Sequence, residues 1–183
     1  MTFTAVGKDI QIWRRFTLSG CLEGEHGVIV CLLRIGDYIL TASEDGYVCI
    51  WNWYNREIIR TINLGVDFYP TVLCHPDTYL NKILIGGASG KLQLWNIRTG
   101  SLIMNFKGYA AGISYIEQTP SVDVMAVGLE DGTIDIMNLK YDEVDALVSV
   151  DFLDSHAISP IFSRNRSIFL QQHGKGSPSC IWR

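Results

Sequence analysis

Short runs of apolar residues recur at regular places along the chain. Six of these runs lie at residues 38–43, 46–51, 83–87, 90–95, 124–128 and 132–137. In the second run of each pair, β-branched or aliphatic side chains stand two positions apart, which is the period of a β-strand. We find no stretch with helical spacing. The pattern therefore predicts an all-β protein in which short strands follow one another in pairs.

The segments between the paired runs carry turn residues. These segments are 44–46, 88–90 and 130–132; each of them ends in Gly, and the first and third contain Asp-Gly. Asp-Gly between two alternating runs is a strong hairpin signal, because both residues tolerate the positive φ angles of a type I′ turn. We therefore expect β-hairpins closed by type I′ turns.

The hairpins belong to an internal repeat. The second strand of each copy ends at an anchor residue, and the anchors are Trp13, Trp51, Trp95, Met137 and Trp182, at intervals of 38, 44, 42 and 45 residues. Further strands are expected at residues 29–33, 71–74 and 113–116 before the hairpins and at residues 58–62, 102–106 and 146–150 after them. Four strands in a repeat of this length, with Trp-Asn at its anchor, resemble the blade of a WD40 β-propeller.

The repeat predicts a propeller fragment of about four blades, of which three are whole and two are partial. The predicted blade pieces are residues 1–22, 23–63, 64–106, 107–150 and 151–183. The first piece supplies only the middle hairpin of its blade. Because an open arc exposes unpaired strand edges, we expect the chain to be a fragment, a truncated product, or a half that needs a partner arc.

The resemblance to WD40 proteins implies a set of structural residues. In that family His, Ser or Thr, Asp and Trp of one blade form a hydrogen-bonded tetrad, and the second copy supplies His26, Ser43, Asp45 and Trp51. Trp95 and Asp131 are the corresponding blade anchors of later copies.

The other copies depart from the tetrad. Tyr109 stands where His is expected, Ser89 replaces Asp, and Met137 replaces Trp. We therefore expect packing, and not a repeated tetrad, to hold most blades together, because a buried Trp contributes a large apolar area.

Composition narrows the class of protein. With 48% apolar residues the chain can bury a core. Its net charge of −4 argues against a domain whose main task is to neutralise phosphates, but does not exclude a local basic patch. The longest apolar run, residues 28–33, is far too short to span a membrane. The five cysteines contain no Cys-x-x-Cys pair, which favours reduced thiols in a soluble, intracellular protein.

The sequence contains no convincing catalytic or ligand-binding motif. Residues 86–91 are rich in Gly, but the spacing of a phosphate-binding loop is absent and a strand follows. The four histidines lack metal-ligand spacing, and the acidic pairs lie in hairpin turns. We expect no enzyme activity, no cofactor, no metal and no small-molecule substrate.

Three longer stretches resemble one family more closely. Residues 5–15, 75–96 and 120–129 are similar, in the same order, to the N-terminal propeller of the Utp21 family, also called the WD repeat-containing protein 36 family. Its members are subunits of the small-subunit processome and the U3 small nucleolar ribonucleoprotein. The resemblance implies a non-catalytic nucleolar scaffold in the nucleus, which supports ribosomal RNA processing. It also implies other WD-repeat processome proteins as partners and an indirect association with U3 and precursor ribosomal RNA.

Loop residues are the candidate partner anchors. These are Trp53, Tyr54 and Arg56 in the turn after the second anchor, and Tyr69, Lys107 and Tyr109 in loops on the opposite rim. Packing against the next blade is the competing interpretation for each of them. The alternative functions are a generic WD40 peptide-binding adaptor, such as a ubiquitin-ligase substrate receptor, and an enzyme with a propeller scaffold.

Overall fold

The computed structural model describes residues 1–15, 17–23, 26–140, 143–144, 158–163 and 167–172. These residues form five antiparallel sheets. The first contains β1 (Thr2–Val6), β2 (Asp9–Arg14) and β3 (Thr17–Leu22). The second contains β4 (Ile29–Ile35), β5 (Tyr38–Ser43), β6 (Tyr47–Asn52) and β7 (Glu57–Asn63). The third contains β8 (Pro70–Cys74), β9 (Lys82–Gly87), β10 (Leu92–Asn96) and β11 (Ser101–Asn105). The fourth contains β12 (Ile113–Gln118), β13 (Val124–Leu129), β14 (Ile134–Asn138) and β15 (Glu143–Val144). The fifth is the hairpin of β16 (Ile158–Ser163) and β17 (Ser167–Gln172).

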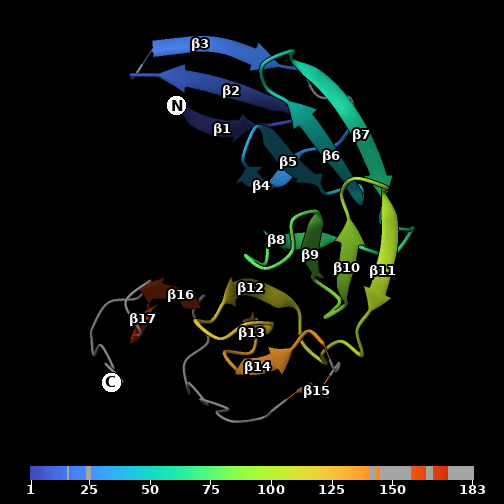
Figure 1. The fold of residues 1–183 in the computed structure, drawn as a ribbon, viewed down its shortest axis with the longest axis vertical. Coiled ribbons are helices and arrows are strands. Elements are labelled where there is room, and N and C mark those ends of the chain that lie inside the picture. The colour runs from blue at the N-terminus through green and yellow to red at the C-terminus, as the bar shows by residue number, and fades with distance from the viewer. Residues whose placement is uncertain (16, 24–25, 141–142, 145–157, 164–166, 173–183) are drawn as a thin grey trace.

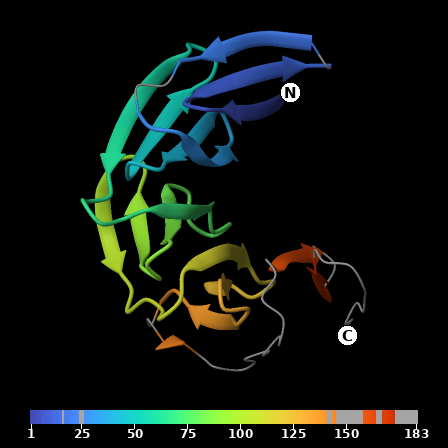
Figure 2. The same ribbon diagram turned by 180° about the vertical axis from the view of Figure 1, so that it is seen from behind.

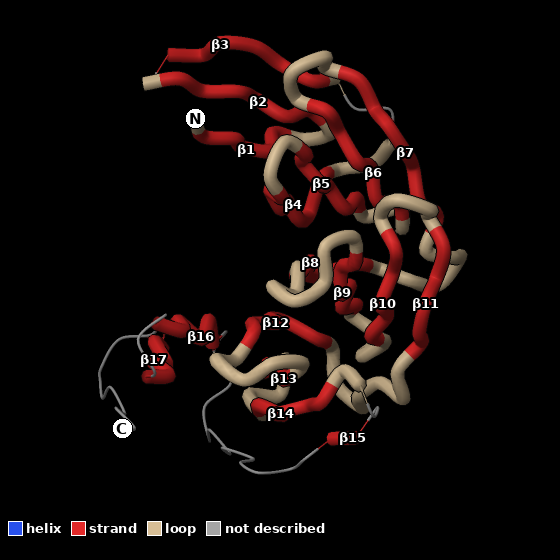
Figure 3. Tube along the Cα trace, in the orientation of Figure 1, coloured by secondary structure: helices blue, strands red, loops and turns tan. Residues whose placement is uncertain are grey.

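The sheets follow one another around an open arc. Figure 1 shows β8 and β12 on the inner side of this arc and β7 and β11 on its outer side, and Figure 2 shows the same arrangement from behind. In Figure 3 the described chain consists of strands and loops, with no helix. Since three sheets have four strands and two have fewer, the prediction of a WD40 propeller fragment with three whole and two partial blades is confirmed.

The core lies between neighbouring sheets. One cluster joins the first and second sheets around Ile10 and Trp51, a second joins the second and third around Ile50 and Ile83, and a third joins the third and fourth around Leu84. The middle strands of the second and third sheets are buried on both faces, because a sheet covers them on either side. This explains the uninterrupted apolar runs of the sequence, such as β9.

The hairpin turns differ from the prediction. Gly46, Gly90 and Gly132 have positive φ angles of 81°, 76° and 88°, but the residue before each of them does not. In all three turns the Gly N–H donates to the carbonyl three residues earlier, at 3.0 to 3.1 Å. This geometry fits a turn closed by a left-handed Gly, so the type I′ prediction is wrong.

The first sheet contains a strand that the sequence pattern does not reveal. β3 (Thr17–Leu22) pairs with β2, so this sheet has three strands and not the middle hairpin alone. Most of its side chains are exposed because β3 is the outermost strand, and exposed strands carry no apolar period. The strand expected at residues 146–150 and the degraded copy at 177–182 lie outside the described residues.

Candidate functional site

The turns of the arc form two rims of different charge. Antiparallel pairing places the turns 44–46, 88–91 and 130–133, with the loops 64–69 and 106–112, at one end of the strands. We call this end the acidic rim, because its exposed residues include Glu44, Asp45, Asp67, Glu130 and Asp131. The turns 14–15, 36–37, 53–56 and 97–100 lie at the other end, which we call the arginine rim.

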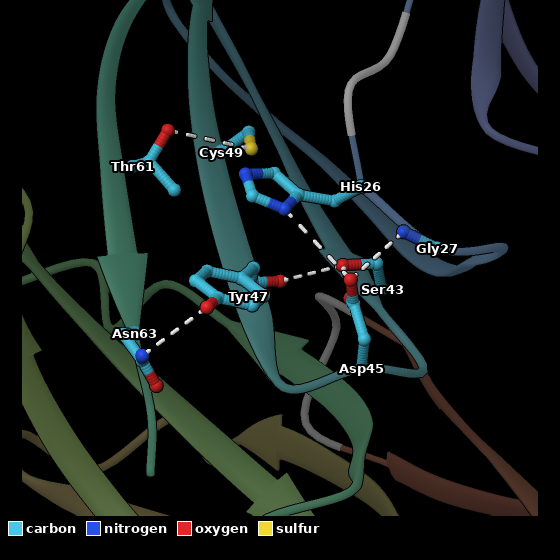
Figure 4. A network of polar contacts seen from close by, with 8 residues as sticks. All are labelled: His26, Gly27, Ser43, Asp45, Tyr47, Cys49, Thr61 and Asn63. Carbon is cyan, nitrogen blue, oxygen red and sulfur yellow. Dashed lines mark hydrogen bonds and ion pairs between the residues drawn. The ribbon is translucent and has the colours of Figure 1, made fainter. Parts of the chain in front are cut away.

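A polar network closes the acidic rim of the second sheet (Figure 4). Asp45 accepts hydrogen bonds from the Ser43 hydroxyl and from the backbone N–H of Gly27, the latter at 3.0 Å. Nδ1 of His26 lies 3.8 Å from a carboxylate oxygen of Asp45. The network therefore ties the β5–β6 turn to the loop that leads into β4.

The His26 ring is also held by an aromatic contact. It stacks on Tyr47 with ring centroids 4.2 Å apart, and the Tyr47 hydroxyl accepts a hydrogen bond from Asn63 at 3.4 Å (Figure 4). Burial would raise the pKa of Asp45, but the hydrogen bonds from Ser43 and Gly27 and the nearby His26 more than offset it, so its pKa is lowered. These contacts stabilise the ionised form of Asp45.

The Trp51 indole does not hydrogen-bond to Ser43, the partner that the tetrad resemblance implies. Its indole N–H donates to the Thr41 hydroxyl at 3.0 Å, and Ser43 instead donates to Asp45 and to the Tyr47 carbonyl. The second blade thus divides the four expected residues into a His26–Ser43–Asp45 network and a separate Trp51–Thr41 pair. Trp51 is buried, so its ring and its N–H both contribute to the blade.

The third and fourth blades use different pairs. The indole N–H of Trp95 donates to the buried Gln93 side chain at 2.9 Å. In the fourth blade the Tyr109 hydroxyl donates to Sδ of Met137 at 3.5 Å. Asp131 accepts from the N–H and hydroxyl of Thr133 within its own turn. The Trp95–Gln93 pair lies within β10 and the Asp131–Thr133 pair within one turn, whereas the Tyr109–Met137 pair joins a hairpin to the loop that precedes it.

The Asn that follows three of the five anchor positions has a role that sequence reasoning missed. Asn52 accepts from the N–H groups of the residues two and three positions later, at 3.0 and 3.3 Å, and Asn96 does the same at 2.9 and 3.1 Å. Asn138 accepts from the N–H of Lys140 at 2.9 Å. The recurring Trp-Asn or Met-Asn was the available signal, since Asn side chains mimic a backbone turn in this way.

Three of the predicted partner-binding residues, Trp53, Tyr54 and Arg56, lie at the corner between the first two sheets. Trp53 packs edge-on against Phe3, with ring centroids 5.9 Å apart, and stacks on Tyr54 at 3.7 Å. Tyr54 is 66% exposed. Arg56 is exposed and reaches across to Gly20 on β3, where an added Cβ would lie 2.9 Å from its guanidinium. Trp53 therefore packs between blades, while Tyr54 and Arg56 lie at the surface.

The other three predicted partner-binding residues, Tyr69, Lys107 and Tyr109, lie on the acidic rim and differ in burial. Tyr69 is 58% exposed and Lys107 is exposed, as expected of surface residues. Tyr109 is half-buried and packs against the core between the third and fourth sheets. Tyr109 thus has a packing role that a surface anchor would not have.

No cluster of three or more metal-binding side chains occurs within the part of the chain that the structure describes. Over the same residues, no helix is long and apolar enough to cross a membrane. Exposed charged and aromatic side chains gather on the two rims.

Comparison with known families decides the identity of the fold. Residues 1–173 match the model of the first β-propeller of the WDR36/Utp21 family. The chain belongs to this family. It is 34% identical to WD repeat-containing protein 36 of Homo sapiens over 142 residues, which cover 77% of this chain and 15% of that protein. It is 36% identical to the U3 small nucleolar RNA-associated protein 21 homolog of Schizosaccharomyces pombe, over 74% of this chain and 16% of that protein.

Two solved structures support the same architecture for this WDR36/Utp21 propeller. The WD40 β-propeller domain of Doa1 superposes with a TM-score of 0.77 at 18% identity, covering 93% of this chain and 57% of that chain. The computationally designed Ika4 protein superposes with a TM-score of 0.69 at 21% identity, covering 88% of this chain and 94% of that chain. At these identities the similarity shows the fold alone.

Proposed function

We propose that this chain is a non-catalytic scaffold piece of the small-subunit processome, the U3-containing particle that processes precursor ribosomal RNA. The match of residues 1–173 to the first propeller of the WDR36/Utp21 family carries this proposal. A relative named as a U3 small nucleolar RNA-associated protein supports the assignment. The site of action would then be the nucleolus, in the nucleus, and the product would be the small ribosomal subunit.

The physical character of the structure supports a scaffold. Successive sheets bury apolar cores between them, and such a stack holds its turns in fixed positions over a long surface. The polar networks around Asp45 and Asn96 connect residues of the same blade and hold its loops in place, while Gln118 and Asp123 accept hydrogen bonds from Asp77 and Thr78 of the neighbouring blade. Their hydrogen-bonding groups are engaged within the protein, as expected of structural residues.

The partners we propose are other WD-repeat proteins of the processome, which would dock on exposed turns. Tyr69 and Lys107 on the acidic rim suit this role, because exposed Tyr contributes strongly to binding at many interfaces and the Lys charge can steer an acidic partner. Association with U3 and precursor RNA through such proteins would be indirect.

Affinity purification of the tagged chain from cells of its source organism tests the proposal. Recovery of U3 RNA and processome proteins is expected, and Tyr69→Ala combined with Lys107→Glu should lower the recovery of proteins while the melting temperature is unchanged. A core variant, Leu84→Asp, serves as the unfolded control. Recovery of ubiquitin-ligase components in place of processome proteins would overturn the proposal in favour of an adaptor.

A further inference from the structure

Positive charge is concentrated at one corner of the arginine rim, although the chain as a whole carries a net charge of −4. The corner lies where the first and second sheets meet, and its exposed arginines are Arg14, Arg15, Arg34 and Arg56. The carboxylates of the same turns are Asp37 and Glu57. Among the described residues, no carboxylate lies within ion-pair distance of these arginines. The Nε–H of Arg34 donates to the carbonyl of Gly36 at 3.2 Å, and the side chains of all four arginines are exposed to solvent.

Contacts between the two sheets bring this corner together. The guanidinium of Arg34 lies 5.9 Å from the ring centroid of Phe3, and Phe3 packs on Trp53. Thr2 pairs with Trp13, so the turn that holds Arg15 lies at the same end of the first sheet as Phe3. Arg56 extends over β3 of that sheet. We call Arg15, Arg34, Arg56, Trp53 and Tyr54 the arginine–aromatic patch.

An open aromatic face lies within the patch. Tyr54 is stacked on Trp53 on one side and is 66% exposed. Trp53 fixes the orientation of the Tyr54 ring, so a planar group can stack on Tyr54 without a large loss of side-chain freedom. Arginines around a pre-oriented aromatic ring are the combination with which proteins bind single-stranded nucleic acids.

Two arginines of the patch occupy unfavourable backbone positions. Arg15 and Arg56 have positive φ angles of 47° and 59°, a region that favours Gly. In the third sheet the corresponding turn position is Gly100, with a φ angle of 73°. The fold alone would accept Gly at residue 56, so the presence of Arg there points to a role for its side chain.

We propose that the arginine–aromatic patch binds single-stranded RNA directly. Arg15, Arg34 and Arg56 would contact successive phosphates, and the exposed face of Tyr54 would stack on a base. An acidic peptide would satisfy the arginines but would leave the Tyr54 ring without a stacking partner, so the pairing of charge with a flat aromatic surface favours RNA. This binding would add a direct RNA contact to the indirect association through partner proteins proposed above, and it does not depend on the scaffold role.

Fluorescence anisotropy with a labelled 20-nucleotide poly(U) RNA tests the proposal on the 183-residue chain. Binding by three phosphate contacts should weaken with salt, with a slope of log K against log[salt] of about −2. Tyr54→Ala should weaken binding by about fivefold or more, since each stacked base contributes at least that much. Arg15→Gly combined with Arg56→Gly should flatten the slope by about 1.4.

The two Gly substitutions separate binding from folding, because Gly is compatible with the positive φ angles at both positions. This variant should bind RNA more weakly and yet melt no lower than the parent chain. The matched control is Lys8→Ala combined with Lys91→Ala, which removes two exposed charges, one from the β1–β2 turn at the acidic-rim end of the strands and one from the acidic rim itself. Tyr69→Ala is the corresponding control for Tyr54→Ala.

Three outcomes would overturn the proposal. The first is a parent chain that does not bind the RNA at low salt. The second is an equal loss of affinity in the patch variants and the acidic-rim controls, which would indicate a general charge effect. The third is tighter binding of a labelled poly-glutamate peptide than of poly(U), with the same sensitivity to the patch variants, which would assign the patch to an acidic protein segment. Loss of RNA binding in the patch variants with unchanged co-purification of processome proteins would support the patch and leave the scaffold role standing.

Discussion

The hydroxyl of Tyr109 donates a hydrogen bond to Sδ of Met137, across 3.5 Å in the fourth blade. These are the two positions at which the WD40 resemblance implies His and Trp. Both side chains belong to the core between the third and fourth sheets. A Tyr–Met pair has thus replaced the polar tetrad with a largely apolar contact, so the fourth blade should depend on the volume of these side chains more than on their polarity.

Substitutions of Met137 test this dependence on volume. Met137→Ala should lower the free energy of unfolding by about 2–5 kcal/mol, because the deletion leaves a cavity in a buried cluster. Met137→Leu conserves volume and should cost less than about 1.5 kcal/mol. Urea denaturation measures both values. Equal losses for the two variants would show that the Tyr109 hydrogen bond, and not packing, stabilises this blade.

The turn after Trp95 offers a test of a single side-chain oxygen. Asn96→Ala removes the acceptor of two backbone N–H groups and should cost about 1 kcal/mol of unfolding free energy. Asn96→Asp retains an oxygen in the same place and should cost less. Thermal melts of the parent and both variants check the order, and a more stable Ala variant would contradict the assigned role.

The sequence pattern predicts the strands of this protein better than it predicts their polar contacts. The alternation before Trp51 is local, so it identifies both the strand and the buried anchor. The acceptor of its indole N–H depends on register: Trp51 pairs with Ile39, which brings Thr41 within reach. Thr41 and Ser43 stand two positions apart on one strand, so the pattern alone does not distinguish them.

Other features escape the sequence because they depend on distant residues or on exposure. Tyr109 and Met137 are 28 positions apart, and no sequence motif predicts their contact. The strand Thr17–Leu22 is mostly exposed and lacks an apolar period. The gathering of arginines at one corner follows from the packing of two sheets, since Arg15 and Arg56 are far apart in the chain.

Close approach between blades makes one glycine essential. A Cβ at Gly90 would clash with the backbone oxygen of Tyr109 and would lie 2.7 Å from that of Ala111. Gly90 also has a positive φ angle of 76°. Because backbone atoms cannot move aside without shifting the next blade, Gly90→Ala should cost more than the roughly 1–2 kcal/mol of a left-handed conformation alone.

Gly7 provides the matched control for Gly90. Its φ angle is 61°, but no atom lies within 4 Å of an added Cβ, so Gly7→Ala meets the conformational cost without the clash. Chemical denaturation of the two variants should show the larger loss for Gly90→Ala. A loss of equal size would mean that the loop around Tyr109 relaxes freely, and the close approach would then contribute nothing to stability.

Acid should weaken the second blade through Asp45. Its pKa is lowered below the ordinary value of 3.8, because the hydrogen bonds from Ser43 and Gly27 and the nearby His26 outweigh the effect of burial. A lowered pKa in the folded state contributes stability that is present above pH 3.8 and is lost as the pH falls through the folded-state pKa. Asp45→Asn should therefore be less stable than the parent at pH 7, and the difference in unfolding free energy should shrink as the pH falls below 3.8.

Ser43→Ala removes one donor to Asp45 and should show part of the same loss at neutral pH. Denaturation curves recorded across this pH range measure the difference in unfolding free energy between the parent and Asp45→Asn. A difference that stays constant down to the lowest pH would show that the ionised carboxylate does not stabilise this turn.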